Sequence, residues 1–109
     1  MKTYDLIDDS GRLFAFEVPS RLGRVGIRKI IEKIPGAKIL KFYGYFATGG
    51  EDIRGEFELN GKIFDVFEPF GDNSRYWIGP KHKGFCDEIN IIRETFIKGK
   101  IPLFSFLSS

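Results

Sequence analysis

The sequence predicts an α+β domain in which a single antiparallel sheet of five or six strands carries two helices on one face. Three observations support this fold class. Runs with the alternation of strands are more numerous than segments with helical spacing, and the two helical segments are separated by several strand-like runs. In addition, Asn60-Gly61 separates two strand-like runs, and this pair favours a two-residue type I′ turn because both residues tolerate positive φ.

Length and composition indicate one domain with a sizeable core. The chain has 109 residues, and we assign residues 1–109 to a single α+β domain. Aromatic residues make up 16% of the chain, and twelve of them are Phe, which supplies bulky side chains for a small core. The net charge of +2 is too small to indicate a nucleic-acid partner by itself.

Cysteine usage and the N-terminal segment predict a cytoplasmic location. Cys86 is the only cysteine, which excludes an internal disulfide and favours a reducing compartment. The start of the chain carries acids where a secretory signal needs an apolar run, and no run approaches the ~20 apolar residues of a membrane span. We therefore expect a cytoplasmic protein with no membrane partner.

The first third of the chain predicts a hairpin followed by a helix. Strand-like runs at 4–7 and 12–18 flank the turn sequence Asp8-Asp9-Ser10-Gly11. A helix is predicted over 22–34, where apolar residues recur at helical spacing, and Pro35-Gly36 ends it.

The rest of the chain predicts one strand, a three-stranded meander and a second helix. We expect the strand over 37–46 to direct Leu40, Phe42 and Phe46 toward the core. The second helix is predicted over 85–98, where apolar residues step by four, three and four. The segment 101–109 is predicted to be either a docked C-terminal tail or an edge strand. The strands of the meander are predicted at 55–59, 62–67 and 75–79.

The turn at Asn60-Gly61 also predicts which side chains face each other. It pairs Phe57 with Phe64 on the core face of the sheet. On the opposite face it sets Glu56 against Asp65, and like charges placed directly opposite each other cost up to about 1 kcal/mol.

Two interpretations of this acidic pair remain open. Basic residues on a neighbouring strand, such as Lys41 or Arg75, would relieve the repulsion. Alternatively, the face is a binding surface, because apolar and aromatic groups mixed with charge are common at protein interfaces. The apolar residues expected on this face are Ile39, Tyr43, Tyr45, Ile63 and Phe67.

The segment from Glu68 to Trp77 is interpreted either as a turn held by local hydrogen bonds or as a recognition loop. Asp, Asn and Ser bond to local amides in turns, whereas Arg, Tyr and Trp are favoured anchors at interfaces. We place the candidate partner-binding surface on the outer face of the sheet and this loop. Its predicted residues are Glu56, Glu58, Asp65, Asp72, Arg75, Tyr76 and Trp77.

Residues with reactive side chains do not form a recognisable catalytic motif. Glu68 and Asp72 are carboxylates four apart in a turn, which is an ordinary arrangement. His82 and Cys86 supply only two soft metal ligands, whereas a closed zinc site needs four. The sequence contains no P-loop, dinucleotide fingerprint or nucleophile elbow. We therefore predict no catalytic residues, no metal site and no cofactor.

The exposed side of the first helix offers an alternative site. It carries five cations and one acid, Glu32, so it could contact the phosphates of a nucleic acid. The alternative nucleic-acid face consists of Arg21, Arg24, Arg28, Lys29 and Lys33.

A short stretch of the same region resembles a known family. Val18-Pro19, Gly23-Arg24-Val25-Gly26, Ile30 and Pro35-Gly36-Ala37-Lys38-Ile39 together resemble the KH RNA-binding family, over about twenty residues. This resemblance implies a G-x-x-G loop between two helices that binds single-stranded RNA.

The first hypothesis on function is a non-enzymatic protein-binding module of the small bacterial cytoplasmic type. Its specific form would be an inhibitor or an immunity protein that neutralises a toxin, so that the partner is another protein. Nucleic-acid binding through the basic first helix is the alternative.

Overall fold

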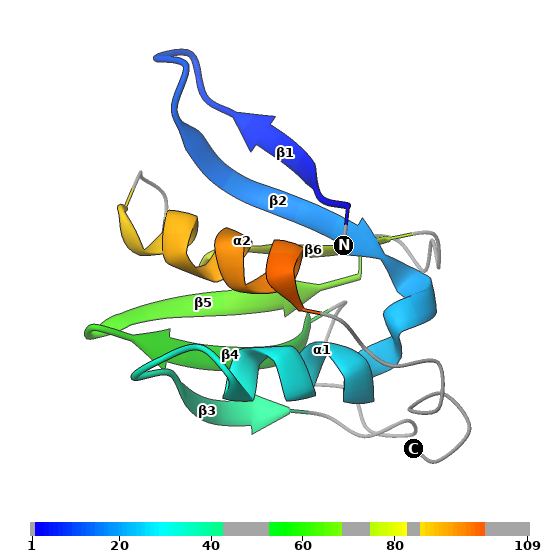
Figure 1. The fold of residues 1–109 in the computed structure, drawn as a ribbon. Coiled ribbons are helices and arrows are strands. Elements are labelled where there is room, and N and C mark those ends of the chain that lie inside the picture. The colour runs from blue at the N-terminus through cyan, green and yellow to red at the C-terminus, as the bar shows by residue number, and fades with distance from the viewer. Residues whose placement is uncertain (1, 43–52, 69–74, 83–85, 100–109) are drawn as a thin grey trace.

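The computed structural model describes residues 2–42, 53–68, 75–82 and 86–99. Within these residues, six strands form one open antiparallel sheet, and two helices lie together on one face of it (Figure 1). This arrangement confirms the predicted α+β class. The strands are β1 (Tyr4–Ile7), β2 (Leu13–Pro19), β3 (Lys38–Phe42), β4 (Ile53–Leu59), β5 (Lys62–Phe67) and β6 (Arg75–Pro80). The helices are α1 (Gly23–Glu32), which a 3₁₀ turn at Ser20–Leu22 precedes, and α2 (Glu88–Lys98).

The strand order is β1-β2-β6-β5-β4-β3, which differs from the order along the chain at one point. Strands β3 to β6 form an antiparallel meander, and β2 pairs with the far edge of that meander, at β6. Because β2 and β3 are separated in the sheet by β6, β5 and β4, the segment between them, which contains the 3₁₀ turn and α1, crosses one face of the sheet (Figure 1). Helix α1 packs beside β3, and α2 packs against β2.

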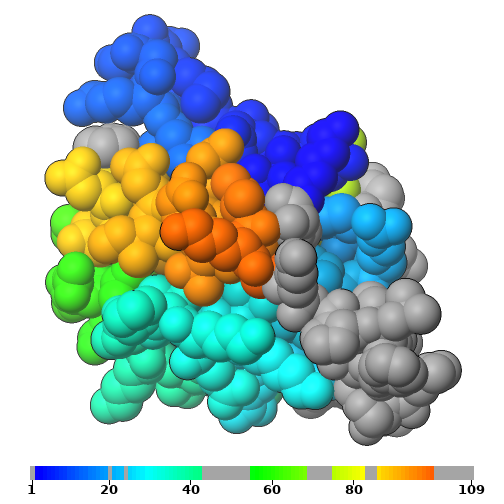
Figure 2. All heavy atoms as spheres, in the orientation of Figure 1, coloured from blue at the N-terminus to red at the C-terminus, as the bar shows by residue number. Residues whose placement is uncertain are grey.

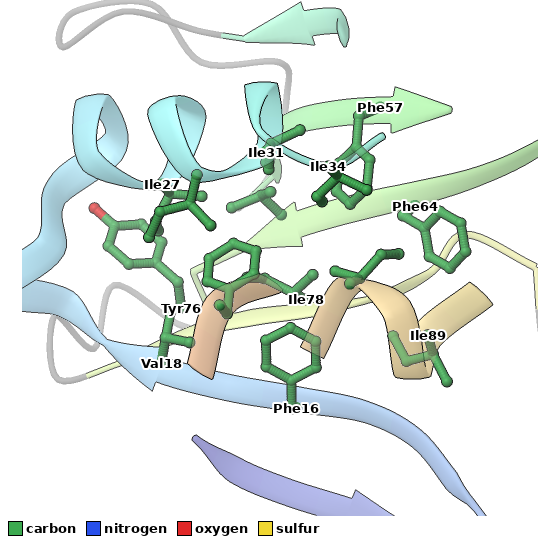
Figure 3. Packing of buried hydrophobic residues seen from close by; sticks show 14 of the residues in the cluster. Phe16, Val18, Ile27, Ile31, Ile34, Phe57, Phe64, Tyr76, Ile78 and Ile89 are labelled. Atoms are coloured by element: carbon green, nitrogen blue, oxygen red, sulfur yellow. The ribbon is translucent and has the colours of Figure 1, made fainter. Parts of the chain in front are cut away.

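The core lies between the two helices and the sheet (Figure 3). Phe57 and Phe64 stack with ring centroids 5.4 Å apart, and Phe16 meets Phe96 of α2 edge to face at the same distance. Side chains of this size each contribute roughly 1.5–3 kcal/mol to stability when they are fully buried. The helices add isoleucines to this core, and one more follows α1 directly. They are Ile27, Ile30 and Ile31 from α1, Ile34 just after α1, and Ile89 and Ile92 from α2.

The turn between β4 and β5 confirms the prediction made from Asn60-Gly61. Both residues have positive φ, 53° at Asn60 and 78° at Gly61, as a type I′ turn requires. The register that follows pairs Phe57 with Phe64 and also Glu56 with Asp65.

The facing predicted for β3 is wrong in part. The pairing with β4 shifts between Ile39 and Lys41, so Ile39 and Phe42 both pack against the core while Leu40 is 39% exposed. A β-bulge of this kind inserts one residue and breaks the alternation on which the prediction rested. Phe42 lies over Gly55, where an added Cβ would meet its ring at 2.6 Å. Phe46 and the segment 101–109 lie outside the described residues.

The helices are shorter than predicted, and the KH resemblance does not extend to the structure. Gly23 to Gly26 form the first turn of α1 rather than a loop between two helices. The implied G-x-x-G loop is therefore wrong. Gly23 has a φ of 68°, which separates the 3₁₀ turn from α1. Neither α1 nor α2 is long and apolar enough to cross a bilayer.

Candidate partner-binding surface

The outer face is the face of the sheet opposite the helices, and a row of large side chains crosses it. Residues that pair across antiparallel strands share a face. Tyr4 of β1 pairs with Glu17 of β2, Glu17 pairs with Trp77 of β6, and Trp77 pairs with Phe67 of β5. We call these four residues, together with Arg75, the aromatic row. The row therefore spans four adjacent strands.

Specific contacts hold the aromatic row in place. The Arg75 guanidinium lies 3.5 Å from the centroid of the Tyr4 ring, and its Nη1 donates a hydrogen bond to Glu17 Oε1 at 3.2 Å. Trp77 and Phe67 meet edge to face, with centroids 6.3 Å apart. The Arg75 side chain remains 43% exposed. The row is thus ordered by its own contacts while part of it stays accessible to a partner.

Small residues beneath Trp77 make room for its indole. A Cβ added at Gly79 would lie 2.6 and 2.7 Å from two carbons of the Trp77 ring. The same Cβ would lie 2.8 Å from the Cβ of Ala15, which is fully buried. The indole therefore packs directly over the backbone at Gly79, which restricts its orientation.

A half-buried acidic pair lies beside the aromatic row. Glu56 is 8% exposed and accepts a hydrogen bond from Lys81 Nζ at 3.0 Å. The repulsion between Glu56 and Asp65 is thus offset by Lys81, a residue that the sequence analysis did not single out. Lys81 directly follows β6, and its backbone N–H donates to Ile63 of β5, which brings it back over the hairpin. Arg75 pairs with Glu17 instead.

Asp65 is the least satisfied group of this face. Its Oδ1 is buried and accepts no hydrogen bond from the residues that the structure describes. Burial raises the pKa of the Asp65 carboxyl, and the neighbouring Glu56 raises it further. An added donor at Oδ1 would remove the cost of leaving this oxygen unpaired.

The structure brings most of the predicted partner-binding residues together. Tyr76 is an exception, because it is only 6% exposed and belongs to the core (Figure 3), so its placement on the outer face is wrong. Ile39 likewise packs against the core. Asp72 lies outside the described residues. The predicted residues that share the outer face are Glu56, Glu58, Asp65, Arg75 and Trp77.

Tyr4 and Glu17 are the functional candidates that the sequence analysis missed. They join the site because β2 pairs with β6, and the two strands are separated by more than fifty residues. No local sequence motif indicates that these two distant strands pair. The alternation of β2 and β6 indicates their two faces, but it does not indicate which strands become neighbours.

The other reactive side chains are dispersed. Glu68 is 6% exposed, and His82 lies in an exposed position. Cys86 packs partly against the core, and burial raises the pKa of its thiol, which favours the protonated, weakly nucleophilic form. Across the described ranges, no three His, Cys, Asp or Glu side chains gather in a way that could hold a metal ion.

The cations of the alternative face lie on the other side of the molecule. Arg28 and Lys29 of α1 are exposed, and so are Arg21 in the 3₁₀ turn before the helix and Lys33 directly after it. The side chain of Arg24 lies outside the described part of the structure. These residues are separated from the aromatic row by the whole thickness of the sheet, since α1 packs on the face opposite to it (Figure 1).

Comparison with known proteins identifies no relative. No family model, no curated protein and no solved structure matches this chain. Function must therefore be argued from the contacts of the chain itself.

Proposed function

We propose that this protein is a non-enzymatic binding module that recognises another protein through the outer face of its sheet. The observation that carries the proposal is the aromatic row, in which Tyr4, Arg75 and Trp77 are held by contacts within the chain. Trp, Tyr and Arg are the side chains that contribute most at interfaces. When such anchors are already ordered, less side-chain entropy is lost on binding.

The size of the outer face suits a partner of this kind. Six strands spaced about 4.8 Å apart, with about six residues each at roughly 3.3 Å, give a face of roughly 29 by 20 Å. A specific complex buries about 800 Å² on each partner, so the projected area of the face, roughly 580 Å², can supply most of one such patch.

The charges of this face favour a partner that presents cationic donors. Glu58 is partly exposed and makes no ion pair with any residue in the described ranges. An Arg or Lys of the partner beside Glu58 would form charge-assisted hydrogen bonds. A rigid surface of this kind fits an inhibitor, such as an immunity protein that occludes a basic surface of a toxin.

Affinity purification from the native host tests the proposal. The tagged protein is purified at low and moderate salt, with and without nuclease. We expect one protein in equal amount with the bait, resistant to nuclease and retained at moderate salt. Recovery of nucleic acid alone, or of a partner that nuclease removes, would contradict the proposal.

A charge-reversal pair locates the contact surface. Glu58→Lys should lower partner recovery at least tenfold. Glu58 is partly exposed and pairs with Lys38 of β3, so the reversal places like charges opposite each other and should cost up to about 1 kcal/mol, which lowers the melting temperature by about 4 °C or less. Glu94→Lys makes the same charge change on α2, where the side chain is 54% exposed, and should leave recovery unchanged. Equal recovery by both variants would remove the outer face from the proposal.

A further inference from the structure

Four exposed cations lie together in and beside α1. Arg12, Lys62, Arg75, Lys81 and Arg93 each form an ion pair with an acid. The other described cations outside the α1 region, Lys2, Lys38, Lys41 and Lys98, form no ion pair with described residues. The same holds for four exposed cations in and beside α1, which differ in lying together along one segment. We call these four residues the basic face: Arg21, Arg28, Lys29 and Lys33.

The fold presents the basic face as a rigid, outward-pointing strip. The opposite side of α1 contributes three isoleucines to the core, Ile27, Ile30 and Ile31, which fixes the rotation of the helix on the sheet (Figure 3). Helix α1 lies at the surface beside α2 (Figure 2). Lys33 follows Lys29 by four residues, so these two cations lie nearly in line along the helix. Arg21 lies in the 3₁₀ turn that precedes α1, beyond the break at Gly23. From Arg28 to Lys33 the strip is roughly 8 Å long at 1.5 Å per residue.

The composition of the strip distinguishes among anionic partners. Its one large exposed apolar side chain among the described residues is Val25, at 52% exposure. A membrane-surface helix needs a broad apolar face with Trp, Phe or Leu, and a protein interface needs an apolar or aromatic centre. The strip has neither. Cations without an apolar centre are typical of contacts to the phosphates of nucleic acids.

From these observations we infer that the basic face of α1 binds the phosphate backbone of nucleic acid without sequence preference. The contact uses point charges on a helix, not the G-x-x-G loop of the KH family. It is independent of the proposed protein partner, because the outer face lies on the other side of the sheet. Both partners can therefore be bound by one molecule.

Fluorescence anisotropy at several salt concentrations tests the inference. The probes are a labelled 20-nucleotide single-stranded RNA and a labelled 20-base-pair DNA duplex. Four phosphate contacts give a slope of log K against log salt of about −2.8 on the single strand and about −3.6 on the duplex. Affinity should then fall about 50- to 150-fold between 50 and 200 mM salt. No binding to either probe at 50 mM salt would overturn the inference.

Two double variants with the same change in net charge assign the contact to α1. Arg28→Gln with Lys29→Gln should halve the slope and weaken binding at least tenfold at 50 mM salt. Lys2→Gln with Arg12→Gln removes two exposed cations near β1, the opposite edge of the sheet, and should weaken binding less than threefold. Equal losses in the two variants would overturn the assignment to α1. If the first variant does not fold, Arg21→Gln with Lys33→Gln replaces it.

Two further probes test the class of partner. Polyglutamate and vesicles of phosphatidylserine and phosphatidylcholine should bind more weakly than the nucleic acids at equal salt. Tighter binding to either of them would overturn the choice of nucleic acid. The Glu58→Lys variant should keep the full salt slope, so failure of the protein-binding proposal and failure of this inference can be told apart.

Discussion

Replacing Gly79 with Ala should displace the Trp77 indole and destabilise the protein. The added Cβ would lie 2.6 to 2.8 Å from carbons of Trp77 and Ala15, whereas carbon contacts are optimal at about 3.5–4.0 Å. The indole must therefore move by roughly 1 Å. Overpacking of this kind costs about 1–3 kcal/mol, and the smaller entropy of the unfolded Ala chain offsets about 0.4–1 kcal/mol of that cost. We expect a net loss of roughly 1–2 kcal/mol, and a melting temperature lower by about 4–8 °C at roughly 4 °C per kcal/mol.

Thermal unfolding followed by circular dichroism measures this loss of stability. Tryptophan fluorescence detects a change in the environment of the indole. Trp77 is the only tryptophan of the chain, so a change in its emission maximum reports a changed environment of this one indole. The effect of Gly79→Ala should shrink in a Trp77→Leu background, because the ring that the new methyl group meets is absent. The coupling energy from the double-mutant cycle should exceed about 0.5 kcal/mol.

Two results would refute this reasoning. Gly79→Ala could leave both the melting temperature and the tryptophan emission unchanged, which would mean that the indole does not pack over Gly79. Alternatively, the two substitutions could be additive, which would mean that the destabilisation has another source, such as the contact with Ala15. Either result would also weaken the claim that Trp77 is ordered before a partner binds.

The remaining predictions concern two carboxylates and pH. Because burial and Glu56 raise the pKa of Asp65 above its usual 3.8, its ionised form destabilises the folded state at neutral pH, and this cost vanishes below the unfolded pKa. Asp65→Asn should therefore raise the unfolding free energy in urea at pH 7, with a smaller gain near pH 4; no gain at pH 7 would contradict this. Hydrogen bonds from Lys62 and Asn60 lower the pKa of Glu88 from 4.5 to about 2, so its stabilisation is complete above pH 4.5 and is lost as the pH falls toward 2. Glu88→Gln should flatten the decline of stability over that range, and a decline as steep as in the wild type would show that Glu88 does not contribute.

Local chemistry made several elements predictable from the sequence. Asn60-Gly61 determines the turn and register of β4 and β5, because residues that tolerate positive φ are required at those two positions. The opposition of Glu56 and Asp65 follows from this register. The apolar spacing of α1 and α2 similarly identified their buried sides, because a helix repeats its faces every 3.6 residues.

The candidate site, in contrast, depends on contacts between distant parts of the chain. Consecutive residues of a strand point to opposite faces, so Tyr76 and Trp77 cannot share the outer face. The pairing of Tyr76 with the buried Val18 decides which of the two lies inside. The same pairing of β2 with β6 places Glu17 next to Arg75. The residues near each of them in the sequence do not indicate this contact.

The sequence by itself therefore determined the class of the fold, the turn at Asn60-Gly61 and the amphipathic helices, all of which rest on interactions within a few residues. Only the tertiary structure decided the strand order, the bulge in β3 and the assembly of the aromatic row. The physical reason is that strand neighbours are chosen by how the whole chain buries its apolar side chains at once. The alternation within each strand indicates its two faces, but it does not indicate which distant strand becomes its neighbour.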